Sequence, residues 1–255
     1  MKTNNISHRA TGLTIPIIKI GFNEEWETDN WYCTICKKPA YGLRSGRKKW
    51  KLGDIPKDIP KLVTGVKGNK DKKALKILRR RLQKALKEPA LAALLNQTIE
   101  EARSRWRKVN KRQFFTLLAQ VLDVPLSLFC REYRAYFTFS TRYPFHGSSF
   151  MFGKHKDFAD LAMHEIMHIE FLKAYTQYCK DKGLDDAQVG HLKEILTVLL
   201  NEDAKHLLSR PDLGYTKHLL IRPKVLRLYR KGGGRGGDFR LFLDKVIELI
   251  RQSDF

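Results

Sequence analysis

Hydrophobic residues recur at helical spacing through the middle of the chain. Four leucines within residues 71–87 fall on one face of a helix: Leu75, Leu78, Leu82 and Leu86. Pro89 ends that pattern and opens a second helical segment at residues 90–109, and residues 112–125 continue as a third. The pattern therefore predicts three successive helices before Pro125.

After these helices the period changes from that of a helix to that of a strand. Hydrophobic and polar residues alternate at residues 131–143, a turn is expected at 144–148, and a second apolar run follows at 149–153. Residues 14–22 are also strand-like. Residues 52–70 are rich in proline and glycine and are expected to form a loop or linker before the helices.

Long helices return in the last part of the chain. Residues 157–180 form a largely apolar helix, and Gly183 is a typical stop signal after it. Asp185 or Asp186 is a suitable N-cap for another helix, which continues to about residue 209. A glycine-rich hinge and a final helix at residues 240–252 complete a mostly helical α+β protein.

The net charge of +22 adds a possible binding partner to this picture. Residues 67–112 hold sixteen Lys and Arg against four Asp and Glu, a net +12. Such a surface attracts polyanions, so the basic helices at residues 70–112 are candidates to bind an anionic partner such as nucleic acid. Trp106, among arginines, could lie against such a ligand. A solvated helix surface explains the same charges equally well.

The cysteines indicate a reducing environment rather than a disulfide framework. There are four in 255 residues: Cys33, Cys36, Cys130 and Cys179. The Cys33-x-x-Cys36 pair lacks a second such pair, so ordinary thiols are favoured over a zinc knuckle, which His8 or His146 would have to complete. The first residues do not resemble a signal peptide, and no run is long enough for a membrane span. A cytoplasmic location is the simplest expectation.

The candidate chemistry lies within the long apolar helix. His164 and His168 are four residues apart, which places both imidazoles on one helix face, with Glu165 between them. Burying these groups without partners is costly, and a shared Zn²⁺ would provide one. Glu165 would then act as the general base on a metal-activated water. The competing interpretation is a hydrogen-bonded core pair without metal.

Residues His164, Glu165 and His168 form the HExxH signature, and residues 132–218 resemble the catalytic domain of zincin metallopeptidases. This resemblance implies one Zn²⁺ per chain, a protein or peptide substrate, and a small antiparallel sheet before the active-site helix. It also implies an edge strand that binds extended substrate. The residues expected in that strand are Ser148, Ser149, Phe150, Met151 and Phe152.

The third metal ligand decides the subclass. No histidine occurs between His168 and His191, so the metzincin pattern fails, whereas gluzincins take a glutamate from the next helix. Glu194 and Glu202 are the two candidates. Glu194 shares its helix face with Thr197 and Asn201, a polar row that would support a metal ligand. Its segment KEILTVLLN also resembles one in small bacterial gluzincins, which favours Glu194 with Glu202 as the alternative.

The resemblance also suggests a donor for the oxyanion that forms during hydrolysis. Gluzincins commonly use a tyrosine or histidine that follows the third ligand, and Tyr215 and His218 are in that position. The basic charge is similar to that of SprT-like proteases, which act on DNA-bound proteins. Those enzymes, however, use a third histidine and often a zinc ribbon, and neither is found here.

Three regions are therefore expected. They are an irregular N-terminal region at residues 1–66, a basic helical region at 67–125 and a zincin-like catalytic domain at 126–255. The predicted function is zinc-dependent peptide-bond hydrolysis. The alternatives are a nucleic-acid-binding protein with a non-catalytic histidine pair, and a specialised protease that cleaves one regulatory or DNA-bound protein.

Overall fold

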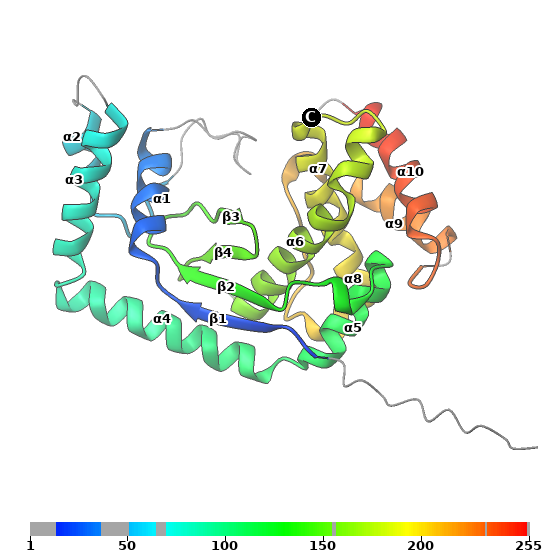
Figure 1. Cartoon of the computed structure of the whole chain (residues 1–255), viewed down its shortest axis with the longest axis horizontal. Coiled ribbons are helices and arrows are strands. Elements are labelled where there is room, and N and C mark those ends of the chain that lie inside the picture. The colour runs from blue at the N-terminus through cyan, green and yellow to red at the C-terminus, as the bar shows by residue number, and fades with distance from the viewer. Residues whose placement is uncertain (1–13, 37–50, 65–69, 155–156, 233, 254–255) are drawn as a thin grey trace, which may run out of the picture.

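A small mixed sheet and the helices packed around it form the protein (Figure 1). The computed structural model describes residues 14–36, 51–64, 70–154, 157–232 and 234–253. Within these residues the protein is mostly helical, and the predicted α+β class is confirmed. His8 and the rest of residues 1–13 lie outside the described residues.

The sheet has four strands in the order β1-β2-β4-β3. These strands are β1 (Ile17–Gly21), β2 (Glu132–Phe137), β3 (Phe145–His146) and β4 (Ser149–Phe152). β2 lies parallel to both β1 and β4, and β3 is antiparallel to β4. The strand-like N-terminal segment is thus confirmed as β1, one outer strand of the sheet.

Two details of the predicted strands are wrong. The alternating segment at 131–143 is a strand only as far as Phe137, and the turn at Gly147 joins β3 to β4 rather than β2 to β4. The sheet is therefore mixed rather than antiparallel. Residues 138–144 connect the end of β2 to β3 at the outer position of the sheet, and the chain then turns back into β4, which lies parallel to β2 and between β2 and β3. Side chains of the N-terminal region hold this connecting segment.

Residues 24–36 form a helix, α1 (Glu24–Cys36), where the sequence predicted irregular structure. The prediction failed because the buried face of α1 is largely polar and gives no hydrophobic period. Asn30 Nδ2 donates to Thr138 Oγ1 at 2.9 Å, and the hydroxyls of Thr34 and Ser140 are 2.7 Å apart. These bonds satisfy the polar groups of α1 while they fix the segment after β2.

Glu27 is the most deeply buried acid of α1. One carboxylate oxygen accepts from the Phe139 amide at 2.9 Å and from the Trp31 indole, whereas the other has no hydrogen-bond partner in the part of the chain that the structure describes. Burial raises the pKa of Glu27 from 4.5 to about 8, although these hydrogen bonds oppose the shift. The folded protein therefore holds a proton that the unfolded chain releases at neutral pH.

This proton predicts a pH-dependent stability that Glu27→Gln removes. Because the folded-state pKa is the higher one, the free energy of unfolding falls as pH rises from about 4.5 to about 8. Between pH 5 and pH 8, the free energy of unfolding of the glutamine variant should increase by about 3 kcal/mol relative to that of the native protein, since one pKa unit is about 1.4 kcal/mol. Urea denaturation at both pH values measures the gain. Glu25→Gln, at an exposed position of α1, is the control, and a gain independent of pH would contradict the prediction.

The helices of the middle region occur where their hydrophobic period predicted them. They are α3 (Lys70–Ala85), α4 (Pro89–Lys108) and α5 (Lys111–Leu122), after a short α2 (Ile59–Thr64) and before a 3₁₀ turn, η1 (Leu126–Leu128). α4 begins with its proline in the first turn, and the Asn110 side chain caps α5 by accepting from Gln113 N.

The last part of the chain is also helical. α6 (Phe158–Asp181) ends before Gly183, whose φ of +84° suits a helix stop. The next helical run comprises α7 (Asp186–Leu196), η2 (Thr197–Leu199) and α8 (Leu200–Asp203). Two further 3₁₀ turns, η3 (Lys205–Leu207) and η4 (Thr216–His218), lead to α9 (Arg222–Lys231) and α10 (Phe239–Arg251). α9 had not been predicted.

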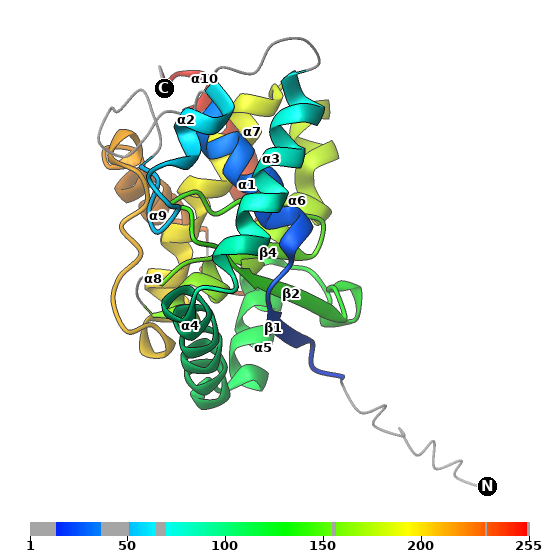
Figure 2. The same ribbon diagram turned by 90° about the vertical axis from the view of Figure 1, so that its left-hand side faces the viewer.

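α6 lies at the centre of the molecule. It packs against β4 and α4 on one side and against α7 on the other, and α9 and α10 complete the layer beyond α7 (Figures 1 and 2). The buried hydrophobic residues form one cluster, which extends from Ile20 in β1 to Ile250 in α10. The three regions expected from the sequence therefore share a single hydrophobic core.

Trp106 belongs to this core rather than to a nucleic-acid surface. Trp106 is only 5% exposed, and its indole packs edge-on against Phe114 and Phe158. The suggestion that this ring lies against nucleic acid is therefore wrong, because a buried indole has no free face for a base. The surrounding arginines project from α4 while its tryptophan packs inward.

Candidate metal centre

The two histidines of the HExxH segment lie side by side on α6. Asp157 caps this helix by accepting from Ala159 N at 3.2 Å, and buried Met163, Ile166 and Met167 hold it in the core. The spacing of four residues brings the rings of His164 and His168 to a centroid distance of 4.2 Å. Both imidazoles consequently face the neighbouring helix, α7.

Glu194 reaches both histidines from α7. Its Oε2 atom is 3.6 Å from His164 Nε2 and 3.5 Å from His168 Nε2. One possible ligand atom from each of the three residues lies within 4.8 Å of the other two. In a tetrahedral zinc site, bonds of about 2.0–2.1 Å place ligand atoms roughly 3.4 Å apart, so both measured distances suit a shared ion.

His168 supplies an independent test of whether these residues fit a metal. Its Nε2 atom is fully buried and has no hydrogen-bond partner among the described residues, although it points toward Glu194. A buried ring nitrogen without a partner loses its hydration without compensation. Two imidazoles and a carboxylate are a donor set that Zn²⁺ prefers, and a bound ion would satisfy this atom. The residues therefore fit the metal that the sequence predicted.

Glu202, the alternative third ligand, is occupied elsewhere. Its carboxylate accepts two hydrogen bonds from Arg230, at 2.9 and 2.6 Å. It lies beyond the end of α7, in α8, and is not part of the group formed by His164, His168 and Glu194. Of the two candidates, the fold brings only Glu194 to the histidines.

Asp212 holds His164 from the side opposite Glu194. Its Oδ2 is 2.5 Å from His164 Nδ1, and its Oδ1 accepts from Arg222 at 2.9 Å and from Thr197 at 3.2 Å. The side chain of Asn201 brackets the Asp212 backbone with two further bonds, of 2.7 and 2.8 Å. A carboxylate on the distal nitrogen fixes the ring so that Nε2 is the atom offered to a metal.

Sequence reasoning missed Asp212 because it lies in a loop, where no helical or strand period marks it. The polar row on the face of Glu194 was the available clue. Thr197 and Asn201 were expected to support Glu194, and in the structure both side chains bind Asp212. Thr197 also donates to the Glu194 backbone carbonyl at 2.9 Å. The polar row of Thr197 and Asn201 therefore marks the part of the helical run that binds the loop with Asp212.

Lys193 places a second positive charge in the centre. Its residue is 8% exposed, and its Nζ donates to Glu194 and lies 3.3 Å from His168 Nδ1. The ammonium also sits over the ring of Phe145, 5.0 Å from the centroid. This residue too was missed, since a lysine on a helix is ordinarily a surface residue. Without an ion, its ammonium balances the charge of Glu194.

Glu194 and Asp212 contribute negative charge to the cluster and set the protonation of its histidines. Burial opposes it, but the Asp212 carboxylate raises the pKa of His164 to about 10. Burial and the Lys193 ammonium lower the pKa of His168. The pKa of Glu194 lies well below its usual value, because the two imidazoles and Lys193 outweigh burial. Glu194 is thus ionised, and a metal would replace the proton held at His164.

Glu165 lies beside His168, and the predicted oxyanion donors lie beside His191 of α7. Glu165 is 7% exposed, and its Oε2 is 3.6 Å from His168 Nδ1. His218 is fully buried, with Nε2 3.1 Å from His191 Nδ1, and the ring of Tyr215 packs edge-on against it. Burial, and then the charge of His191, lower the pKa of His218 to about 4, so this imidazole is neutral.

The strand predicted to bind substrate is not at an edge. Ser149–Phe152 form β4, which pairs with β2 on one side and β3 on the other. The prediction missed the two-residue strand β3, which turns back onto β4 and takes the outer position. The Phe145 ring of β3 lies 6.1 Å from the His168 ring, so the edge strand beside the candidate centre is β3.

Other sequence features do not form a second centre within the described residues. All four cysteines are free thiols, and Cys33 and Cys36 lie in the last part of α1. In the part of the chain that the structure describes, His164, His168 and Glu194 are the one group of three or more such side chains placed to share an ion. No helix among these residues is long and apolar enough to cross a bilayer.

No family model, curated protein or solved structure matches this chain.

Proposed function

We propose that this chain is a zinc-dependent metallopeptidase of the gluzincin type. The observation that carries the proposal is the convergence of His164, His168 and Glu194. Within the described residues, the buried His168 Nε2 that faces this position has no hydrogen-bond partner. A small sheet before the histidine helix and a glutamate on the next helix also support a zincin-like catalytic domain.

In this proposal His164, His168 and Glu194 hold one Zn²⁺. The ion, when bound, lowers the pKa of a water molecule toward about 7 and polarises the substrate carbonyl. Glu165 takes the proton of the attacking water and delivers it to the leaving amine nitrogen. Asp212 and the residues that bind it keep His164 in the tautomer that offers Nε2.

The proposed substrate contacts involve the edge strand β3 and residues 215–218. A protein or peptide substrate in extended form would pair with the main chain of β3, beside Phe145. Tyr215 and His218 are the candidates to donate a hydrogen bond to the oxyanion. Because His218 is neutral, it would act as a hydrogen-bond donor rather than as a cation.

The test combines metal analysis with two variants. Protein supplied with zinc should hold about one ion per chain, and His164→Ala should lose it. Glu165→Gln should retain the ion and lose peptide hydrolysis by about 10³-fold, because only the general base is removed. A folded native protein that binds no zinc would exclude the proposal. Zinc binding without hydrolysis of any peptide library would favour the alternative, a non-catalytic histidine pair.

A further inference from the structure

β1 exposes one side of its backbone, because it is an outer strand of the sheet. Ile17 N donates to Arg131 O at 3.1 Å, so the main-chain groups of Ile17 point toward β2. In a parallel ladder these directions alternate, and the N–H and C=O groups of Ile18 and Ile20 therefore point away from the sheet. The Ile20 carbonyl does accept from an arginine outside the sheet, Arg103, at 2.8 Å.

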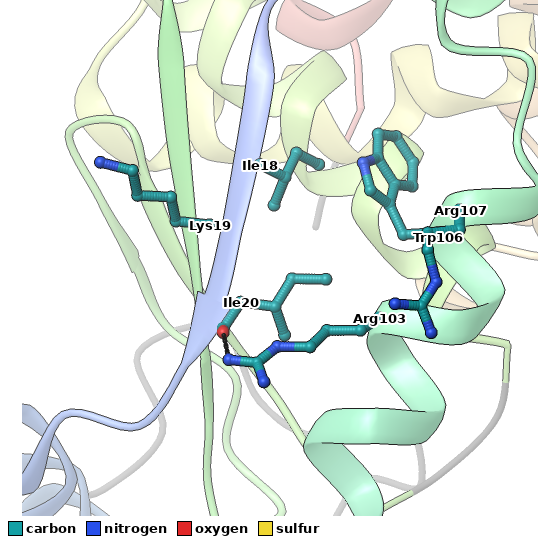
Figure 3. A pocket seen from close by; sticks show the side chains of 6 residues that line it. All are labelled: Ile18, Lys19, Ile20, Arg103, Trp106 and Arg107. Atoms are coloured by element: carbon teal, nitrogen blue, oxygen red, sulfur yellow. Dashed lines mark hydrogen bonds between the residues drawn. The ribbon is translucent and has the colours of Figure 1, made fainter.

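A cavity of about 470 Å³ lies along this exposed edge, between β1 and α4 (Figure 3). We call it the β1–α4 groove. The residues that line it are Ile18, Lys19, Ile20, Arg103, Trp106 and Arg107. In Figure 3 the side chains from α4 face those of Ile18 and Ile20 across the groove, whereas the Lys19 side chain points away from it. An edge strand thus forms one wall and a basic helix the other.

The charges of the groove favour an anionic ligand. Lys19 is neutralised by Glu132 at 2.6 Å, and Arg103 pairs with Glu100 at 2.6 Å. Within the described residues, Arg107 has no ion pair with an acidic side chain. The surrounding segment, residues 67–112, carries a net +12 from sixteen basic and four acidic residues. Carboxylates that enter this groove meet an excess of guanidinium groups.

We propose that the β1–α4 groove binds an extended, acidic peptide segment of a partner protein. The segment adds a strand to β1, pairing with the outward main-chain groups of Ile18 and Ile20. Its backbone replaces Arg103 on the Ile20 carbonyl, and the Arg103 and Arg107 guanidinium groups then bind its carboxylates. This site lies on the β1 side of the sheet, at the opposite edge from β3, and is independent of the proposed metal chemistry.

A polypeptide fits the groove better than a nucleic acid does. The outward main-chain donors and acceptors of a strand edge match a peptide backbone. Single-stranded nucleic acid usually binds by stacking its bases on exposed aromatic rings, but Trp106 is only 5% exposed. The groove therefore offers the contacts of strand addition without those of base stacking.

Fluorescence anisotropy with the full chain tests the proposal. The probe is a short labelled peptide that alternates valine with aspartate, and a peptide with asparagine at the acidic positions is its neutral match. We expect the acidic peptide to bind at least about tenfold more tightly, since its carboxylates pair with the arginines. Equal binding of the two peptides would overturn the proposal, as would stronger binding of a single-stranded oligonucleotide than of the acidic peptide.

A matched pair of charge reversals locates the binding. Arg107→Glu and Arg80→Glu each change the net charge from +22 to +20, and both residues are exposed. Arg107 lines the groove, whereas Arg80 lies on α3. Arg107→Glu should lower the affinity for the acidic peptide by about tenfold or more, and Arg80→Glu should lower it by no more than about twofold. Similar losses in the two variants would mean that net charge alone attracts the peptide.

Backbone methylation of the probe tests strand addition without changing the protein. Alternate amides of a strand point to opposite edges, so two versions of the acidic peptide can be methylated along one edge or the other. Only one edge can pair with β1, and methylation of that edge should abolish binding while methylation of the other leaves it. Equal binding of both methylated peptides would overturn the proposed pairing.

Discussion

Glu194→Ala is expected to lower zinc affinity by about 10³-fold or more, whereas Glu202→Ala should leave it unchanged. Glu194 approaches both histidine Nε2 atoms, at 3.6 and 3.5 Å, while Glu202 is bound to Arg230. Removal of one of the three proposed ligands would leave a site that water must complete. Competition against a chromophoric chelator measures both affinities under identical conditions.

Lys193 makes a second Glu194 variant necessary. Alanine at position 194 removes the carboxylate that this buried ammonium contacts, and the protein could lose stability for that reason alone. Glu194→Gln keeps the volume and one oxygen, so a folded glutamine variant that has lost zinc separates ligation from folding. Zinc loss in Glu202→Ala with zinc retained in both Glu194 variants would assign the third ligand to Glu202.

Asp212→Ala should lower zinc affinity by about 10- to 100-fold and also destabilise the fold by about 3 kcal/mol. The affinity falls because His164 loses the acceptor that orients it, at 2.5 Å from Nδ1. The stability falls because Arg222, only 4% exposed, loses the carboxylate 2.9 Å from its guanidinium. Chelator competition measures the first effect and urea denaturation of the metal-free protein measures the second.

A matched carboxylate elsewhere separates these two effects. Asp203 accepts from the Tyr229 hydroxyl at 2.7 Å and lies outside the candidate centre. Asp203→Ala should reduce stability without a change in zinc affinity, because no ligand depends on it. If Asp203→Ala and Asp212→Ala reduced zinc affinity equally, Asp212 would have no specific role in orienting His164.

The sequence predicted the parts of the candidate centre that local spacing determines. His164 and His168 share a helix face because of their separation alone, and α6 itself follows from its apolar residues and its cap. The prediction of Glu194 as a ligand required two further conditions. α7 must pack against α6, and the Glu194 side chain must face α6. The polar row it shares with Thr197 and Asn201 provided the second.

The remaining features depend on contacts distant in the sequence. Asp212 lies in a loop and is positioned by Asn201 and Arg222. Lys193 can be recognised as a buried residue of the centre only once its ammonium is seen over the Phe145 ring. α1 was missed because its buried side chains, Asn30 and Thr34 among them, are polar and bond to a segment more than a hundred residues away. Hydrophobic period cannot reveal an interface that consists of hydrogen bonds.

The parallel pairing of β1 with β2 has a consequence for how the chain folds. Residues 22–131, which include α1 to α5, separate the two strands along the chain. Closure of so long a loop is entropically costly, and native contacts of this range slow folding. During synthesis β1 leaves the ribosome long before its partner strand exists. β1 therefore waits for β2, and we expect the sheet that supports α6 to form late.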